Sequence, residues 1–276
     1  MDLIQAIILA AIQGVSAWIP ISSKTQVILA ADALFHVPFA TAVAFALALH
    51  VGDLIAALYK YRTEYTDAVH EVLKPKKVTQ FQADQKSQTA RFLILSVLAS
   101  AAVGLPAYLL LRQAFAGLSG EPLLFAIGLL LIVMAAITWH SRKKTVTEKA
   151  LDLKTTLLTG AAQGLAVIPG ISRSGITQCT LLLQGVPQEK AMRLSFLMSA
   201  PMIFAAVIAF QLVEGFGGLD LGLVLVGIAV AAVASLLTME AVTKIARNIP
   251  AWQFMAAVGL LALVPFVLKV TLHATG

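Results

Sequence analysis

The chain has 276 residues, of which 59% are hydrophobic and only 12% are charged, and its mean hydropathy is +0.88. A water-soluble domain needs a polar surface that this composition cannot supply, so the chain is predicted to be an integral membrane protein. The single cysteine, Cys179, excludes an internal disulfide and a metal site built from cysteines. The net charge of +6 does not indicate nucleic-acid binding, because most of the cations fall in the segments between the predicted membrane spans.

The N-terminal run, about residues 1–36, is apolar but is interrupted by Trp18-Ile19-Pro20-Ile21-Ser22-Ser23-Lys24. Because it contains a hydroxyl cluster and lacks a basic leader, we expect no removable signal peptide. The run is long enough for two half-helices broken at Pro20, which predicts a re-entrant hairpin whose tip stops at membrane depth. Irregular backbone is tolerated there only where it lines a polar cavity or is buried in protein.

Six further segments are predicted to cross the membrane, since a spanning helix needs about 20 apolar residues. They are about 38–60, 91–113, 121–141, 190–213, 219–244 and 251–272. The intervening segment of about 61–90, which contains Lys74-Pro75-Lys76-Lys77, is predicted to be a cytoplasmic loop or an interfacial helix. Its charges are expected to face solvent or lipid headgroups.

The segment of about 154–187 repeats the pattern of the first run. Gln163-Gly164 is followed by Ile168-Pro169-Gly170 and Ser172-Arg173-Ser174, as Gln13-Gly14 is followed by Ile19-Pro20 and Ser22-Ser23-Lys24. The spacing from glutamine to proline differs by one residue, so the two copies are similar and not identical. This segment is predicted to form a second re-entrant hairpin, broken at Pro169-Gly170.

The cations predict the orientation, because short loops rich in Lys and Arg stay in the cytoplasm. If each hairpin returns to the face it entered from and each span crosses, one face receives nearly all cations and the other only Arg112 and Lys269. Lys24 and Arg173 remain at the hairpin tips. We therefore expect a multi-pass plasma-membrane protein with cytoplasmic basic loops and both termini outside.

The predicted fold is a single all-α membrane domain over residues 1–276, with six transmembrane helices and two re-entrant helical hairpins in an inverted-topology repeat. Repeat one covers about 1–141 and repeat two about 154–272, and an odd number of crossings in each turns the second upside down. The first hairpin then opens to the outside. Inverted repeats with broken helices near the midplane are typical of transporters.

The two tips would form an anion site if they meet. Paired serines start each second half-helix, where free N–H groups and the positive end of the helix dipole favour an anion. Arg173 offers a planar fork for phosphate oxygens and Lys24 a point charge. The alternative is that the serines only cap their helices. They are Ser22, Ser23, Ser172 and Ser174.

Other polar residues within the apolar segments are candidates of a weaker kind. His50 and Asp53 lie three residues apart and share one helix face. They could form a proton relay, a pair of metal ligands, a partner for Lys24 or a hydrogen bond between helices. Glutamines in membranes more often join helices than bind ligands, and those kept as candidates are Gln13, Gln163 and Gln178.

At these motifs the chain resembles the BacA-type undecaprenyl-diphosphate phosphatase family, membrane enzymes that recycle the polyprenyl carrier lipid for envelope glycan synthesis. Residues 169–177 match the family motif PGxSRSxxT at every specified position, and Trp18-Ile19-Pro20-Ile21-Ser22-Ser23 matches the core of EGxxE[FW]xPxSSxGH. The resemblance implies that Ser23 is the nucleophile, that Arg173 binds the diphosphate and that a divalent cation, Mg²⁺ or Ca²⁺, takes part. No ligand residues for this metal are predicted. The substrate-binding residues expected around them are Ser22, Lys24, Thr25, Gln26, Ser172, Ser174 and Thr177.

The chain departs from the family motif where the chemistry is expected. The two family glutamates fall on Gln13 and Ala17, and the family histidine falls on Gln26. The Ser-Lys-Thr-Gln form is similar to a divergent, archaeal branch. Ala17 removes the last motif carboxylate, whether by natural loss or by replacement, so we expect this chain to hydrolyse the lipid diphosphate poorly or not at all.

Two functions therefore stay open. The first is hydrolysis of a polyprenyl diphosphate to the monophosphate carrier, with the active site opening to the outside. The alternative is a flippase or carrier for polyprenyl phosphates that does not hydrolyse them. Both imply a polyprenyl lipid and membrane lipids as partners and no nucleic acid, and both leave a homodimer open.

Overall fold

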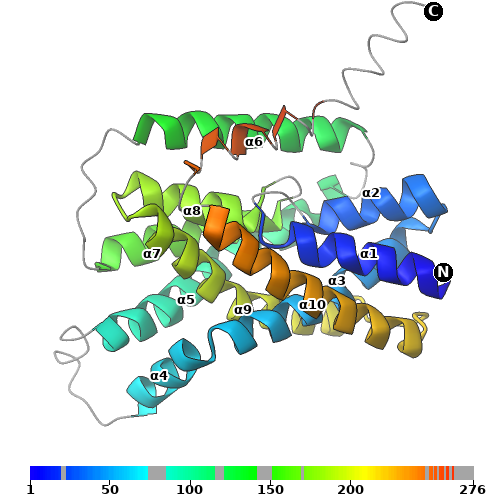
Figure 1. Cartoon of the computed structure of the whole chain (residues 1–276), viewed down its shortest axis with the longest axis horizontal. Helices are drawn as coiled ribbons and strands as arrows, with labels where there is room; N and C mark the ends of the chain where they lie inside the picture. Colours follow the sequence, from blue (N-terminus) through cyan, green and yellow to red (C-terminus); the bar gives the residue numbers. More distant parts are fainter. Residues whose placement is uncertain are drawn as a thin grey trace, which may run out of the picture.

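The computed structural model describes residues 1–19, 23–73, 85–115, 121–141, 151–168 and 171–245, with shorter pieces between 249 and 263. Every regular element in this described part is helical, as the composition predicted. The long helices pack side by side, and α6 (Glu121–Ser141) runs along one edge of the molecule (Figure 1). Met255, which follows α10 in the sequence, packs in one buried cluster with Met134 and Ala135 of α6.

Both predicted hairpins are pairs of short helices. The first consists of α1 (Leu3–Ser16) and α2 (Ser23–Phe35), and the second of α7 (Leu153–Gly164) and α8 (Arg173–Leu183), with a 3-10 turn, η2 (Leu165–Val167), after α7. Asp2 and Asp152 cap α1 and α7 by accepting backbone N–H bonds. The first pair lies on one side of the picture and the second on the other (Figure 1).

Four of the predicted spans are confirmed as long apolar helices. They are α3 (Phe39–Lys60), α5 (Gln85–Phe115), α9 (Gln188–Val213) and α10 (Leu221–Ile245), each long and apolar enough to cross a membrane. The span predicted at 121–141 is helical as α6. Most of the span predicted at 251–272 lies outside the described residues.

The long helix α3 lies at the centre of the molecule, packed on α1, α2, α9 and α10. Its crossing with α10 depends on Gly52, because a Cβ added there would lie 2.5 Å from the Ile228 carbonyl oxygen. A Cβ at Gly14 would likewise lie 2.5 Å from the Ala231 carbonyl oxygen of α10, and a Cβ at Gly164 of α7 would lie 2.7 Å from the Ser100 carbonyl oxygen of α5. Small residues at helix crossings are the usual means by which membrane helices approach closely.

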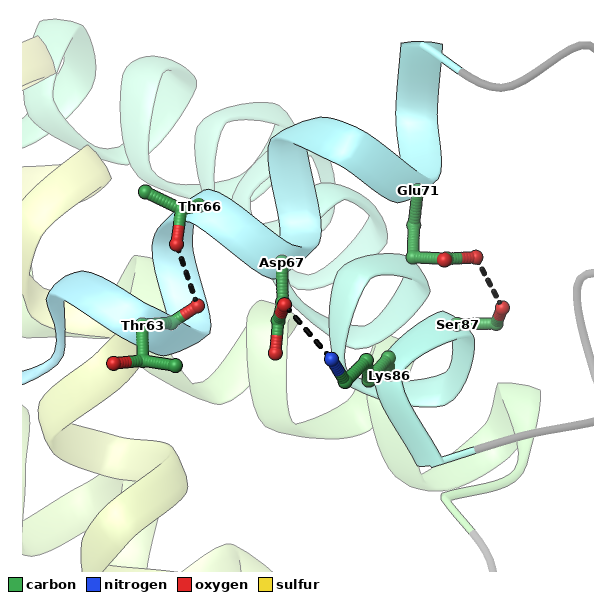
Figure 2. A network of polar contacts seen from close by, with 6 residues as sticks. All are labelled: Thr63, Thr66, Asp67, Glu71, Lys86 and Ser87. Carbon is green, nitrogen blue, oxygen red and sulfur yellow. Dashed lines mark hydrogen bonds and ion pairs between the residues drawn. The ribbon is translucent and has the colours of Figure 1, made fainter.

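The segment predicted as a loop or an interfacial helix over about 61–90 contains a helix, α4 (Arg62–Leu73), and α5 begins already at Gln85. Figure 2 shows why it is ordered: Lys86 pairs with Asp67 at 3.0 Å, and Ser87 Oγ donates to Glu71 at 2.7 Å. Glu71 is only 3% exposed, so this charge is not solvated as expected. The lysines at 74, 76 and 77 lie outside the described residues.

Candidate functional site

Each sequence motif lies where one half-helix ends and the next begins, as predicted. Helix α1 ends at Ser16 and α2 starts at Ser23, while α7 and η2 end by Val167 and α8 starts at Arg173. A predicted site residue, Ser22, lies outside the described residues, as do both breaking prolines. The start of each second half-helix therefore carries a serine or arginine that the sequence assigned to the anion site.

The tips of the two hairpins meet. Ser174 Oγ, on α8, donates a hydrogen bond of 2.9 Å to the carbonyl oxygen of Ile19, at the end of the first half-hairpin. Beside it, the Trp18 ring packs edge-on against Phe196 of α9, with ring centroids 5.0 Å apart. The two motifs, far apart in the sequence, thus form one site at the middle of the helix bundle.

The two motif cations lie at the starts of the second half-helices, Lys24 on α2 and Arg173 on α8. Both are half-buried, and neither forms an ion pair with any residue that the structure describes. At longer range both charges interact electrostatically with the His50 imidazole, and Arg173 also interacts with Asp53. Two half-buried cations without ion-pair partners favour binding of an anion, because it is costly to withdraw an unpaired charge from water.

A network of polar side chains centred on Gln13 contacts Ser23, the nucleophile candidate. Gln13 Nε2 lies 3.1 Å from Ser23 Oγ, 3.2 Å from His50 Nδ1 and 2.7 Å from Asp53 Oδ2. Ser235 Oγ, on α10, donates to the other Asp53 oxygen at 2.6 Å. The network joins α1, α2, α3 and α10. It places His50 and Asp53, which the sequence could only suggest, directly beside the first motif.

The serines of the second motif have the capping role that the sequence left open. Ser172 is the N-cap of α8 and accepts the backbone N–H of Gly175 at 3.2 Å. Its Oγ is also 3.3 Å from Ser174 Oγ. A capped helix start still directs its other N–H groups and its dipole toward the site, so capping and anion binding are compatible.

The remaining candidates are placed as follows. Thr177 is buried, and its hydroxyl bonds to Ser195 of α9, which makes it a contact between helices. Gln163 donates to Ser100 of α5 at 3.2 Å, a contact of the kind expected for a membrane glutamine. On α2 and α8, Thr25 and Gln178 are buried and Gln26 is half-buried.

Sequence reasoning missed the serines that the other helices contribute. All three are buried, and each bonds to a candidate residue: Ser235 to Asp53, Ser100 to Gln163 and Ser195 to Thr177. A lone serine in an apolar helix was the only signal, and it does not say which partner it meets. Among the described residues, Gln13 Oε1 and Trp18 Nε1 are buried polar atoms without a hydrogen-bond partner.

Position 17 is packed as an apolar residue. Ala17 caps the C-terminus of α1, is 7% exposed and belongs to a buried cluster that includes Trp18 and Phe196. The structure therefore offers no carboxylate from this position. The carboxylate of this site is that of Asp53, which is fully buried.

Comparison with known proteins agrees with the motifs. Residues 6–264 match the family described as "Bacitracin resistance protein BacA". The chain is 34% identical to an undecaprenyl-diphosphatase of Haloarcula marismortui over 94% of this chain and 95% of that protein. It is 33% identical to an undecaprenyl-diphosphatase of Methanococcoides burtonii (95% and 97%) and 29% identical to one of Saccharolobus solfataricus (95% of each). The chain therefore belongs to the BacA family of membrane proteins, whose curated relatives are undecaprenyl-diphosphatases.

Proposed function

We propose that this protein hydrolyses a polyprenyl diphosphate to the monophosphate, the activity for which its relatives are named. The observation that carries the proposal is the contact between the two tips, Ser174 Oγ to the Ile19 carbonyl. That contact gathers a serine, two cations and two helix starts around one place. A diphosphate headgroup, with several negative oxygens, is the ligand that this set suits best.

The residues suggest a division of roles. Ser23 Oγ forms a bond to the terminal phosphorus while the bridging P–O bond breaks, and polyprenyl monophosphate leaves with the hydroxyl proton. Water then cleaves the phosphoserine, which releases phosphate and restores Ser23. Arg173, Lys24 and the N–H groups at the start of α8 stabilise the negative charge on the phosphorus oxygens during both steps.

A divalent cation fits this site as a partner of the substrate. The described residues contain no group of three or more His, Cys, Asp or Glu that could hold a metal alone. Mg²⁺ is usually bound through one or two protein oxygens plus substrate phosphates. The buried, unpartnered Gln13 Oε1 and the neighbouring Asp53 carboxylate are such oxygens. When bound, the ion would neutralise part of the phosphate charge.

The experiment that tests this function is phosphate release from a C55 or shorter polyprenyl diphosphate in detergent with Mg²⁺ or Ca²⁺. The unaltered chain is compared with Ala17→Glu, which returns the carboxylate of the family motif. We expect the glutamate variant to be active and the unaltered chain to be much slower. If neither chain releases phosphate while both bind the lipid through Arg173, the hydrolase proposal fails.

Transport of polyprenyl phosphates is the second candidate, and the packing favours it in one respect. Helix α1 packs on α10 at Gly14, and α7 packs on α5 at Gly164, the corresponding residue of the second copy. We infer from this correspondence that the two halves form an inverted repeat. In this arrangement both termini lie outside, and the first hairpin opens to the outside. Lipid transfer in sealed vesicles, with and without Arg173→Ala, separates the two functions.

A further inference from the structure

Asp53 is a buried carboxylate whose hydrogen bonds bear on Ser23 as well as on a bound cation. It is fully buried on α3, and both its oxygens accept short hydrogen bonds, Oδ2 from Gln13 at 2.7 Å and Oδ1 from Ser235 at 2.6 Å. Arg173 interacts with it electrostatically. A buried charge held this firmly by groups from two other helices is fixed in direction as well as in position.

The hydrogen atoms of this network can be assigned from its geometry. His50 Nδ1 lies 2.7 Å from the carbonyl oxygen of Ala46, and a carbonyl can only accept, so Nδ1 carries the imidazole hydrogen. It therefore cannot accept from Gln13, although the two atoms are 3.2 Å apart. The two amide hydrogens of Gln13 are left for its other neighbours, Asp53 Oδ2 and Ser23 Oγ.

This assignment makes Ser23 an acceptor. The Asp53 carboxylate requires that Gln13 turn its NH₂ group and not its oxygen toward it, and the same NH₂ group then donates to Ser23 Oγ. Since Ser23 accepts from Gln13, its own hydrogen is free to leave when Oγ attacks. In the same cluster, His50 Nε2 is left as the unprotonated ring nitrogen.

We propose that Asp53 is a positioning residue for the nucleophile: it fixes the Gln13 amide so that Ser23 is presented as an acceptor, in a chain whose position 17 lacks a carboxylate. The proposal rests on the proposed hydrolysis for its biological meaning. Its structural content, the dependence of Ser23 reactivity on Asp53, can be measured without the lipid substrate.

Asparagine at position 53 removes the constraint on the Gln13 amide. Its own amide can meet Gln13 with its oxygen or with its NH₂ group, since the Ser235 hydroxyl on the other side can donate or accept. Where it presents the NH₂ group, the Gln13 oxygen turns toward it and Ser23 must donate its hydrogen to that oxygen. Gln13→Glu alone places two carboxylates in contact and also disturbs Ser23. The double variant Gln13→Glu/Asp53→Asn again pairs the two residues, but through a carboxylate at position 13, which accepts the Ser23 hydrogen and can take its proton directly.

The test follows the reaction of Ser23 with an alkyl fluorophosphonate, in which Oγ displaces fluoride from phosphorus and the proton leaves with it. Labelling of the detergent-solubilised chain is quantified by mass spectrometry of the peptide that contains Ser23, with Ser23→Ala as the blank. Phosphate release from a polyprenyl diphosphate is measured in parallel, for the unaltered chain and for Ala17→Glu. Thr238→Val, which removes a hydroxyl that bonds within α10 to Ala234, is the matched control.

We expect Asp53→Asn to slow labelling and kcat by about 10- to 100-fold, with KM nearly unchanged, since small displacements of a reacting group have effects of this order. The double variant should recover to within a few-fold of the unaltered chain, because residues 13 and 53 are paired again and the carboxylate at position 13 can take the Ser23 proton. Thr238→Val should not differ from the unaltered chain. Should Asp53→Asn fail to fold, the labelling of the double variant still decides the matter.

The proposal is overturned if Asp53→Asn is labelled as fast as the unaltered chain, if the double variant is as slow as the slower single variant, or if Ser23 is not labelled at all. Labelling that depends on Asp53, together with no phosphate release from either the unaltered chain or Ala17→Glu, supports the positioning role and refutes the hydrolase proposal. The two ideas therefore fail separately.

Discussion

Ser174 Oγ donates a hydrogen bond of 2.9 Å to the carbonyl oxygen of Ile19, and this bond joins positions 155 residues apart. It is a direct link between the two motifs, and both of its atoms lie at the tips of broken helices. Each of the two motifs that it joins carries one cation, Lys24 or Arg173.

Removal of this link should loosen the site. We expect Ser174→Ala to lower stability by about 1 kcal/mol, because the partly buried Ile19 carbonyl loses its partner, and to reduce phosphate release more than lipid binding. Thermal unfolding in detergent and the two kinetic constants measure this. Thr180→Val, whose hydroxyl bonds only to Ile176 of its own helix, is the control. Equal losses in the two variants would show that the link has no special role.

Gly14 should not tolerate a side chain. A Cβ at this position would lie 2.5 Å from the Ala231 carbonyl oxygen and 2.6 Å from the Ala234 Cβ, so α1 must move away from α10. We expect Gly14→Ala to destabilise the protein by about 1–3 kcal/mol, as overpacking does, and to lower activity because Gln13 moves too. Gly217→Ala, where nothing lies within 4 Å, should be neutral. A Gly14→Ala protein of unchanged melting temperature would contradict this packing.

Arg173 should not be replaceable by lysine. A guanidinium can bind two phosphate oxygens at once, whereas an ammonium is a point charge. We expect Arg173→Lys to weaken binding of a polyprenyl diphosphate by about tenfold and Arg173→Ala by more, since one charge-assisted hydrogen bond contributes about 1.5–3 kcal/mol. Titration in detergent micelles measures this. Binding by Arg173→Lys at the unaltered affinity would mean that only the charge is used.

Tyr65 should anchor α4 over a wide pH range. Burial raises the pKa of its phenol above the ordinary value of about 10, and the phenol donates to the Leu197 carbonyl oxygen at 2.7 Å. The contribution to stability should therefore be complete below about pH 10 and be lost only as the pH rises through the folded-state pKa. Tyr65→Phe should lower stability by about 1 kcal/mol, equally at pH 6 and pH 9. A difference that vanishes by pH 9 would contradict the raised pKa.

Local sequence signals predicted the paired half-helices and four of the spans, because helix breaks and long apolar helices depend on residues close together in the sequence. A proline inside an apolar run breaks a helix wherever it lies, so the breaks near Pro20 and Pro169 were predictable. The contacts of Gln13 were not, since the residues that meet on α3 and α10 depend on how helices cross. The helix α4 was left open because its order comes from pairs such as Glu71 and Ser87, which lie on separate elements.

The glycine crossings determine which parts of this molecule can shift against each other. At Gly14 and Gly52, α1 and α3 touch the backbone of α10, and at Gly164 α7 touches the backbone of α5. Helices in backbone contact cannot slide without separating, so we expect the members of each set to move together. Gln13 and Asp53 belong to the first set, while Arg173 follows the hairpin of the second. A relative displacement of the two sets would change the distance between the nucleophile and the phosphate-binding arginine and leave the polar network around Gln13 intact.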